Sequence, residues 1–344
     1  MMLDPVHPVI ESHYLETEEG LFFAVKGLLH PPDLFLACLR YVPDPNGDRG
    51  KNGRLYRRMY HFEEQEQFLQ THYPRYLAFE PTIQATLQCV QRQSIRHIFD
   101  PRAYLQVLSQ QVKHDSLEED TLNFTRQLQK VSGIPQQSLG ISGSLLIGMH
   151  TTHSDLDISV YGAQNCLSLH RTLKRLLALG KSEAISQLDP QGMEALYSER
   201  SGDTQMTYDD FLRSEQVKVN QGHFRGRVYF IRFLKEPEET GEVYGDHRYV
   251  PLGRAEIEAT VAADDDTIFT PCIYPLADVH VLQGSPKHRV QEIVSFRGRF
   301  CDQARVGDPI QARGTIEQVT DKSGSTWYRL LLGNSVEDTM FLRR

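Results

Sequence analysis

The spacing of apolar residues changes along the chain and predicts an α+β protein of three parts. The first part, residues 1–100, contains short apolar stretches typical of strands and two segments with helical spacing. The expected strands lie at 21–29, 35–42 and 55–62, and the expected helical segments at 63–69 and 83–93. We therefore expect an N-terminal mixed α/β unit.

The second part, residues 101–240, is expected to be richer in helices. Asp100 and Pro101 form a typical helix start, because aspartate accepts hydrogen bonds from the first turn and proline is tolerated there. Ser116 is the expected cap of a second helix, which Gly133 ends. Apolar spacing predicts helices at 101–112, 116–131 and 164–179, further short helices within 182–219, and a strand at 226–235.

The third part, residues 241–344, has the pattern of an all-β domain. An acidic segment rich in turn-forming residues, 237–245, leads into it and is expected to be a linker. Short apolar segments then recur with turns between them, at 255–262, 267–274, 290–296, 309–319 and 327–332. This spacing predicts a small β-rich domain, either a barrel or a sandwich.

Composition and charge exclude several classes of protein. The 344 residues include no run of 18 apolar residues and no signal-peptide pattern, so we expect no membrane partner. The five cysteines are widely spaced and form no CxxC pair, which is typical of reduced thiols in the cytoplasm. The net charge of -8 argues against a surface that binds nucleic acid everywhere, although it allows a local basic groove.

Residues 140–162 carry the pattern with the clearest chemical meaning. Asp155 and Asp157 alternate with Leu156 and Ile158, as expected of a strand with one face in the core. This alternation directs both carboxylates to one face, about 6.6 Å apart along the strand. Carboxylates placed together repel each other unless a cation lies between them, and Mg²⁺ commonly binds one or two carboxylates together with substrate phosphates. Asp155 and Asp157 are therefore expected to bind a metal.

A glycine–serine pair precedes these aspartates by about ten residues. Gly143 allows the backbone to approach a ligand closely, and Ser144 adds a hydroxyl. Residues 144–148 could begin a helix, whose N-terminus would present free N–H groups to phosphate. A phosphate cradle followed by an Asp-x-Asp strand is the arrangement expected of a metal–nucleotide site.

The whole pattern is Ser142-Gly143-Ser144, ten residues, and then Asp155-Leu156-Asp157-Ile158, and it resembles the signature of the DNA polymerase β-like nucleotidyltransferase superfamily. The motif covers about twenty residues, within a compatible core at 101–236. The resemblance implies that Gly143 and Ser144 hold the triphosphate of an NTP, with Ser154 as a further candidate. It also implies that Asp155 and Asp157 hold two Mg²⁺ or Mn²⁺ ions. The flanking regions are similar to uncharacterised predicted nucleotidyltransferases of prokaryotes.

The chain departs from this family at one important position. Active members usually carry a third carboxylate on a later strand, often as the general base. The dipeptide Ile231-Arg232 resembles the end of that strand, which places the expected acid at Phe230, a residue that can neither bind a metal nor accept a proton. Four acids could substitute for it, and the sequence alone does not select among Glu242, Asp246, Glu256 and Glu258.

A basic cluster in the first part is the candidate surface for a polyanionic acceptor such as RNA. Its members lie within ten residues, beside Tyr56 and Tyr60: Arg49, Lys51, Arg54, Arg57 and Arg58. Basic residues among aromatic ones suit phosphate backbones and stacked bases, but they are also typical of a solvated hairpin. His150 and His153 are likewise either phosphate or metal contacts or ordinary loop residues.

These observations predict a metal-dependent transfer of a nucleoside monophosphate from an NTP to a hydroxyl acceptor, either RNA or another molecule. Phe230 keeps open an alternative interpretation, a non-catalytic nucleotide- or RNA-binding module that has kept the nucleotidyltransferase fold. A third hypothesis is a toxin–antitoxin-like regulator that modifies a protein partner.

Overall fold

The computed structural model describes residues 7–180, 182, 184–202, 205–284 and 287–343, which fall into two units. The first unit contains residues up to Glu80, Ala85–Ser186 and Gly222–Glu242. The second contains Pro81–Gln84, Gln187–Gln221 and the chain from Val243 onward. The N-terminal strands and the strand that follows Asp155 therefore belong to the same unit.

An eight-stranded sheet forms the N-terminal part of the first unit. Its strands are β1 (Tyr14–Thr17), β2 (Phe22–Val25), β3 (Leu34–Pro43), β4 (Arg49–Lys51), β5 (Arg54–Arg58), β6 (Leu77–Glu80), β7 (Ala85–Gln91) and β8 (Ile95–Phe99). The main order is β4-β5-β3-β2-β1-β8, and β7 pairs with both β3 and β6. One face packs its apolar residues, such as Leu15, Phe23 and Leu39, with Leu69 of helix α1 (Phe62–His72). The strand expected at 35–42 and the helix expected at 63–69 are confirmed.

The prediction of a helix at 83–93 is wrong, because this segment contains strand β7. Cys89 pairs with Leu36 of β3, and Leu87 pairs with Ala78 of β6. Hydrogen bonds to the strands on both sides therefore pair the backbone groups of this segment, and its β-branched residues suit the extended conformation. The apolar spacing alone did not distinguish the two states, since the partners of β7 are distant in sequence.

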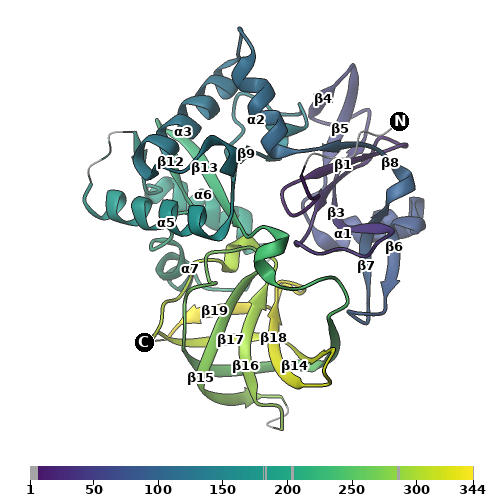
Figure 1. Ribbon diagram of the computed structural model, residues 1–344, viewed down its shortest axis with the longest axis vertical. Helices are drawn as coiled ribbons and strands as arrows, with labels where there is room; N and C mark the ends of the chain where they lie inside the picture. Colours follow the sequence, from purple (N-terminus) through teal and green to yellow (C-terminus); the bar gives the residue numbers. More distant parts are fainter. Residues whose placement is uncertain (1–6, 181, 183, 203–204, 285–286, 344) are drawn as a thin grey trace. The chain divides into compact units, whose positions relative to one another are not determined.

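A five-stranded sheet forms the rest of the first unit, in the order β11-β12-β13-β10-β9. The strands are β9 (Leu139–Ile141), β10 (Leu156–Tyr161), β11 (Ile185–Ser186), β12 (Gln221–Phe224) and β13 (Arg227–Leu234). Strand β10 lies between an antiparallel β9 and a parallel β13. Helices α3 (Ser116–Ser132) and α5 (Ala163–Ala178) pack against β10 and against each other (Figure 1).

The helix ends follow local hydrogen bonding. Asp100 caps α2 (Pro101–Gln110) as expected, because its carboxylate accepts from the N–H groups of Arg102 and Ala103. The cap expected at Ser116 is wrong: Asp115 takes this role in α3. The Asp115 carboxylate accepts from the N–H groups of the first turn at 2.9 Å. The backbone N–H of Asp115 in turn donates to the Glu118 carboxylate.

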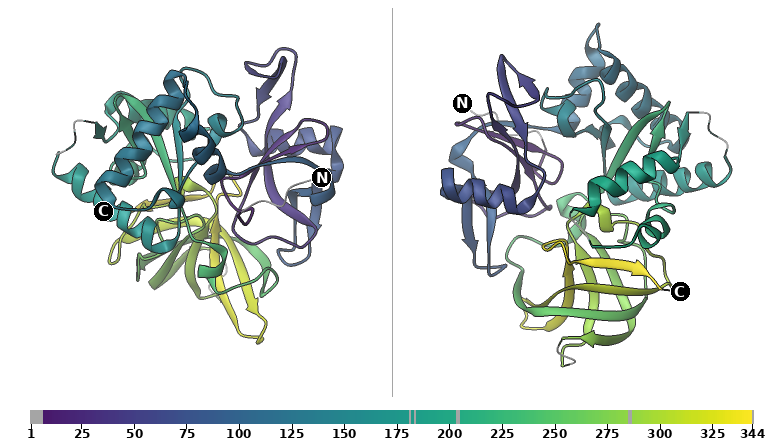
Figure 2. Two further views of the ribbon diagram at one scale, coloured as in Figure 1. Left: turned by 45° about the horizontal axis from the view of Figure 1, so that its top comes forward. Right: turned by 180° about the vertical axis from the view of Figure 1, so that it is seen from behind.

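The second unit contains a closed six-stranded barrel, which Figure 2 shows from two further directions. Its strands are β14 (His247–Val261), β15 (Cys272–Gln283), β16 (Val290–Ser295), β17 (Pro309–Asp321), β18 (Thr326–Leu332) and β19 (Thr339–Leu342). The pairing of β14 with β17 closes the sheet. The sequence predicted either a barrel or a sandwich, and the barrel is confirmed. Inward residues such as Ile257, Ile293 and Leu330 form its core.

Shorter helices complete the described chain. The remaining α-helices are α4 (Gly143–Leu146), α6 (Pro190–Ser201) and α7 (Tyr208–Glu215), and the 3-10 helices are η1 (Pro74–Tyr76), η2 (Arg92–Ser94), η3 (Gln136–Ser138), η4 (Pro237–Thr240) and η5 (Gly298–Phe300). The expected short helices within 182–219 are thus confirmed by α6 and α7. None of the helices in the described ranges has the length and apolar character needed to cross a membrane.

Candidate functional site

The glycine–serine turn and the Asp-x-Asp segment meet in the first unit. Gly143 begins α4 with a φ of +65°, and an ideal Cβ at this position would lie 2.7 Å from Cγ and 2.9 Å from Cβ of Asp157. The N–H group of Ser142 donates to the carbonyl of Asp157 at 2.9 Å. The turn therefore lies directly against Asp157, and only glycine leaves room for this approach.

Asp157 lies near the start of β10, between β13 and β9 in the five-stranded sheet, and Asp155 lies just before this strand. Leu156 and Ile158 are buried, as the alternating pattern predicts. Asp157 is half-buried within the strand, and Asp155 is exposed one residue before the strand begins. Because the two aspartates are two residues apart, an extended backbone directs both side chains to the same face of the sheet.

Phe230 occupies the position where the family pattern expects a third acid. In the parallel pairing of β10 and β13, Asp157 is in register with Phe230. The guanidinium of Arg232 lies over the Phe230 ring, 5.3 Å from its centroid. Among the residues that the structure describes, no group of three His, Cys, Asp or Glu side chains is placed to hold a metal ion. The site thus offers a pair of carboxylates rather than a triad.

The four acids considered as replacements lie elsewhere in the fold. Glu242 is exposed at the end of the first unit. The others belong to the second unit, where Asp246 contacts Lys322, Glu256 accepts from Gln311, and Glu258 binds Arg343. Each of these three acids therefore already contacts a residue of the second unit.

The loop between the two halves of the motif is held by its own polar residues. The imidazole of His150 lies 2.7 Å from the carboxylate of Asp115, the cap of α3. The hydroxyl of Ser154 accepts from the N–H of Thr151 at 2.9 Å, so in this structure it closes a turn of the loop. His153 is exposed.

Arg227 fixes this loop from strand β13. Its guanidinium binds Asp120 of α3 at 3.0 Å and donates to the carbonyl of Thr152 at 2.6 Å. The loop is therefore connected to the helix and the sheet on which Asp155 and Asp157 depend for their position.

The basic cluster does not form one surface. Arg49 pairs with Asp48 at 2.8 Å, and Arg57 contacts both Asp44 and Glu64. Arg54 is exposed. The contacts of these three arginines match those of a solvated hairpin rather than those of a surface that binds a polyanion.

Lys51, in contrast, contacts the segment that follows the glycine–serine turn. The ammonium of Lys51 donates to the carbonyl of Ile147, just after α4, at 2.6 Å, and it lies 5.1 Å from the centroid of the Phe99 ring. Ile147 also packs with Phe22 and Tyr41 on the second face of the N-terminal sheet. The two sheets of the first unit therefore share a small core next to the glycine–serine turn.

The charge of Asp157 acts on both Tyr14 of β1 and Arg58 of β5. Burial raises the pKa of the Tyr14 hydroxyl and the charge of Asp157 raises it further, although nearby arginines oppose this shift. Burial disfavours the charged form of Arg58, but neighbouring tyrosines and Asp157 together raise its pKa. Arg58 therefore stays protonated, and its guanidinium lies over the Tyr60 ring, 4.5 Å from the centroid.

A buried ion-pair network connects the N-terminal sheet with β13. Glu11 is 1% exposed, and its carboxylate contacts Lys26 at 2.7 Å and Arg232 at 3.3 Å. It also accepts from the N–H of Gly27 at 2.9 Å. Burial alone would raise the pKa of Glu11, but these partners outweigh it and lower the pKa, so the carboxylate is ionised. The sequence pointed to Arg232 only through its place in the family strand, and its pairing with Glu11 was not identified, because the two positions are separated by more than two hundred residues.

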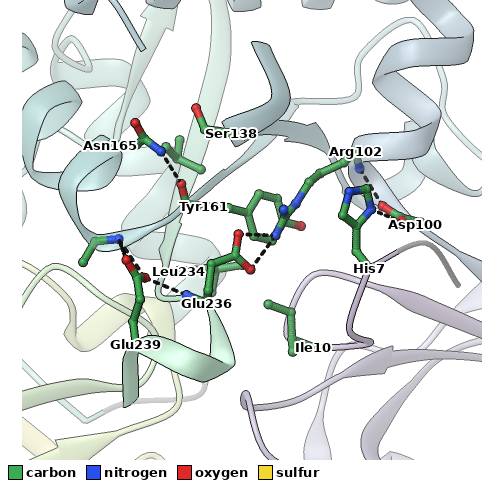
Figure 3. Close-up of polar contacts among 12 residues, drawn as sticks. His7, Ile10, Asp100, Arg102, Ser138, Tyr161, Asn165, Leu234, Glu236 and Glu239 are labelled. Carbon is green, nitrogen blue, oxygen red and sulfur yellow. Dashed lines mark hydrogen bonds and ion pairs between the residues drawn. The ribbon is translucent and has the colours of Figure 1, made fainter. Parts of the chain in front are cut away.

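A second network braces the opposite end of β10 (Figure 3). One nitrogen of Arg102 donates to both carboxylate oxygens of Glu236, at 2.7 and 2.8 Å, while the guanidinium lies over the Tyr161 ring. Glu239 accepts from the N–H of Ala163, the first residue of α5. These contacts join α2, β10, α5 and the segment after β13 without involving Asp155 or Asp157.

Comparison with known proteins shows similarity over nearly the whole chain. The uncharacterized protein MJ1086 of Methanocaldococcus jannaschii is 31% identical over 332 residues, which cover 94% of this chain and 95% of the archaeal protein. No protein-family model matches the chain, and no solved structure matches it. The similarity to the archaeal protein extends through both units.

Proposed function

The chain belongs to the family of the archaeal protein MJ1086, and we propose that it is a metal-dependent nucleotidyltransferase, which transfers a nucleoside monophosphate from an NTP to a hydroxyl acceptor. One observation carries this proposal: the backbone of Gly143 lies against the carboxylate of Asp157, at a distance that excludes any side chain. This contact supports the proposal, because the turn that would hold phosphate is then adjacent to Asp157, a potential metal ligand.

The residues of the site suit a magnesium ion that arrives with the nucleotide. Asp155 and Asp157 supply two carboxylates, and Mg²⁺ commonly completes its coordination with phosphate oxygens and water. The ion would supply neutralisation of the triphosphate charge. Because position 143 carries no side chain, its backbone lies directly beside the Asp157 carboxylate. This arrangement suits a ligand that contacts both the turn and the carboxylate.

The other polar groups of the turn would orient the triphosphate. The side chain of Ser144 makes no hydrogen bond with the residues described, so its hydroxyl is available to a phosphate oxygen. Ser142 is already engaged, since its hydroxyl donates to the carbonyl of Ser12 at 2.8 Å. That contact joins the turn to the segment just before β1.

The transfer itself requires positioning more than a strong base. The acceptor oxygen forms a bond to the α-phosphorus, the bond from this phosphorus to the oxygen of the β-phosphate breaks, and pyrophosphate leaves. Because Phe230 is in register with Asp157, we assign the hydroxyl proton to solvent rather than to a third carboxylate. Slow transfer is the expected consequence, since a positioned base contributes a factor of about 10² to 10⁴.

Transfer of label tests the proposal directly. The full chain is incubated with Mg²⁺, pooled RNA and each of the four α-labelled NTPs, and label is expected in RNA. Asp155→Asn and Asp157→Asn should each abolish Mg²⁺-dependent NTP binding and transfer, whereas Asp265→Asn, in an exposed turn of the second unit, should leave both unchanged. NTP binding that survives both active-site substitutions would remove the site assignment.

Phe230 favours a second candidate, a nucleotide- or RNA-binding module without catalysis. This candidate predicts that NTP binds tightly in the same experiment, but that no label appears in any acceptor. Label on protein instead of RNA would support the modification of a protein partner.

A further inference from the structure

The chain forms a tight turn over residues 151–154, immediately before Asp155. The N–H of Ser154 donates to the carbonyl of Thr151 at 3.1 Å, and the N–H of Thr151 donates to the hydroxyl of Ser154 at 2.9 Å. The N–H of His153 donates to the hydroxyl of Thr151 at 3.3 Å. All of these bonds lie within the turn itself. Asp155 follows the turn and precedes β10, so its position depends on what holds the turn against the sheet.

Arg227 holds this turn from the neighbouring strand. It is the first residue of β13, which pairs parallel with β10, and the register extended by two residues places it next to Ser154. Its Nη1 atom donates to the carbonyl of Thr152 at 2.6 Å and to the carbonyl of Ser154 at 3.4 Å. The Ser154 carbonyl belongs to the peptide bond that leads into Asp155. Because a peptide bond is planar, this contact restricts the direction in which the backbone enters Asp155.

Asp120 of α3 orients the guanidinium that makes these bonds. The Nε atom of Arg227 donates to the Asp120 carboxylate at 3.0 Å, while Nη1 binds the turn. One helical turn further along α3, the Phe124 ring packs on the Tyr229 ring of β13, with 4.8 Å between the centroids. A guanidinium carries several donors in one rigid plane, so it can bind a carboxylate and a carbonyl together. Arg227 therefore joins α3, β13 and the turn.

The Arg227 side chain lies on the face of the sheet opposite to Asp157. Tyr229 follows Arg227 by two residues on β13 and packs on α3, as Arg227 does through Asp120. Phe230 is in register with Asp157, and successive residues of a strand face opposite ways, so Asp157 faces away from α3. Arg227 can therefore act on the candidate metal ligands through the turn, but not by contact with a metal or a nucleotide.

We propose that Arg227, oriented by Asp120, is a positioning residue of the candidate metal site, because it holds the turn that places Asp155 beside Asp157. Asp157 is fixed within β10, whereas Asp155 is exposed and precedes the strand, so Asp155 is the ligand that needs an anchor. Groups that hold metal ligands from outside the coordination sphere typically contribute a factor of about 10 to 100 in metal affinity. The effect on metal binding rests on the proposed function, but the anchoring of the turn does not.

Mn²⁺ binding to the full chain, measured by electron paramagnetic resonance, tests the positioning role. Arg227→Gln should weaken Mn²⁺ binding about tenfold or more. Arg227→Lys keeps a cation that can donate to the turn, so it should recover part of the lost affinity. Arg102→Gln is the matched control, because Arg102 braces the opposite end of β10 through Glu236. This variant should bind Mn²⁺ within about twofold of the native chain, since distant sites act independently.

Two further variants of the same contact cover the case in which Arg227→Gln does not fold. Asp120→Asn removes the charge that orients Arg227 but leaves its bonds to the turn possible, so it should weaken Mn²⁺ binding less than Arg227→Gln does. If only Asp120→Asn and Arg227→Lys fold, both should still bind Mn²⁺ more weakly than Arg102→Gln does. Native affinity in both of them overturns the proposal.

Hydrogen–deuterium exchange without metal separates the anchor from the metal. Arg227→Gln should speed exchange in residues 151–155, and Arg102→Gln should leave this segment unchanged. Unchanged exchange in Arg227→Gln overturns the proposal, and so do equal losses of Mn²⁺ affinity in Arg227→Gln and Arg102→Gln. A native chain that binds no Mn²⁺, but whose turn still exchanges faster in Arg227→Gln, keeps the anchor and loses both its role in metal binding and the proposed function.

Discussion

The carboxylate of Asp157 occupies the space that a side chain at Gly143 would need. Gly143 precedes Asp157 by fourteen residues, and the two meet because β9 and β10 pair antiparallel on either side of the connecting loop. The hydrogen bond from Ser142 N–H to the Asp157 carbonyl fixes this approach. A local requirement for glycine is therefore coupled to the position of a potential metal ligand.

We expect Gly143→Ala to weaken nucleotide binding at least tenfold through this contact. A new Cβ would displace the Asp157 carboxylate, in addition to placing an alanine at a positive φ. Gly148→Ala is a matched control, because Gly148 has the same φ of +65° but its Cβ would meet only the Lys51 ammonium at 3.5 Å. Strain alone, about 1–2 kcal/mol, should appear in both variants as a lower free energy of unfolding.

Titration calorimetry with MgNTP, alongside chemical denaturation, separates the two effects. Gly143→Ala should bind at least tenfold more weakly than Gly148→Ala, even after correction for any unfolded fraction. Similar affinities in the two variants would show that the turn does not position Asp157 for binding.

Phe230→Asp should add a third carboxylate next to Asp157. The side chain at position 230 is in register with Asp157 on the neighbouring parallel strand, so the two carboxylates would lie close enough to share a divalent ion. We expect at least tenfold tighter Mn²⁺ binding, measured by electron paramagnetic resonance, and faster label transfer. Phe230→Asn has nearly the same shape without the charge and should bind Mn²⁺ as the native chain does. Equal Mn²⁺ affinities for the two variants would contradict the placement.

Acid should destabilise the first unit through His13. Burial lowers the pKa of this fully buried imidazole from 6.5 to about 4, although nearby Asp100 partly opposes the shift. Between these two values the unfolded chain binds more protons than the folded chain, so stability falls as the pH falls through this interval. His13 should make the protein about 2 kcal/mol less stable at pH 5 than at pH 7.

Urea denaturation at the two pH values measures this contribution. His13→Gln should reduce the difference between them, because glutamine does not titrate. His153→Gln removes an exposed imidazole and should leave the difference unchanged. If the two variants respond to pH in the same way, another group is responsible for the acid sensitivity.

Local patterns were sufficient to predict most elements of the first unit. The cap at Asp100 and the strand after Asp155 depend on hydrogen bonds and burial within a few residues, and both are confirmed. Strand β7 was mistaken for a helix because its state depends on pairing with β3 and β6. The cap of α3 was misplaced by one residue, because Asp115 and Ser116 are both good caps and only the geometry selects between them.

The candidate site could be predicted only where its residues are close in sequence. The motif from Gly143 to Asp157 spans fifteen residues, and its spacing carried the prediction. The ion pair between Glu11 and Arg232 joins positions more than two hundred residues apart, so no spacing could have connected them. The basic cluster was defined by proximity in sequence, and the structure separates Arg58 from Arg57 because successive residues of a strand face opposite ways.

Lys51 should stabilise the glycine–serine turn from the N-terminal sheet. Its ammonium donates to the Ile147 carbonyl at 2.6 Å and lies near the Phe22 and Phe99 rings, so Lys51→Met would leave that carbonyl without this donor. We expect a loss of about 1–2 kcal/mol in the free energy of unfolding. Hydrogen–deuterium exchange should also become faster in residues 143–149. Lys51→Arg keeps a cationic donor and should protect the segment nearly as well, so faster exchange in Lys51→Arg alone, or in neither variant, would show that the turn is held by other contacts.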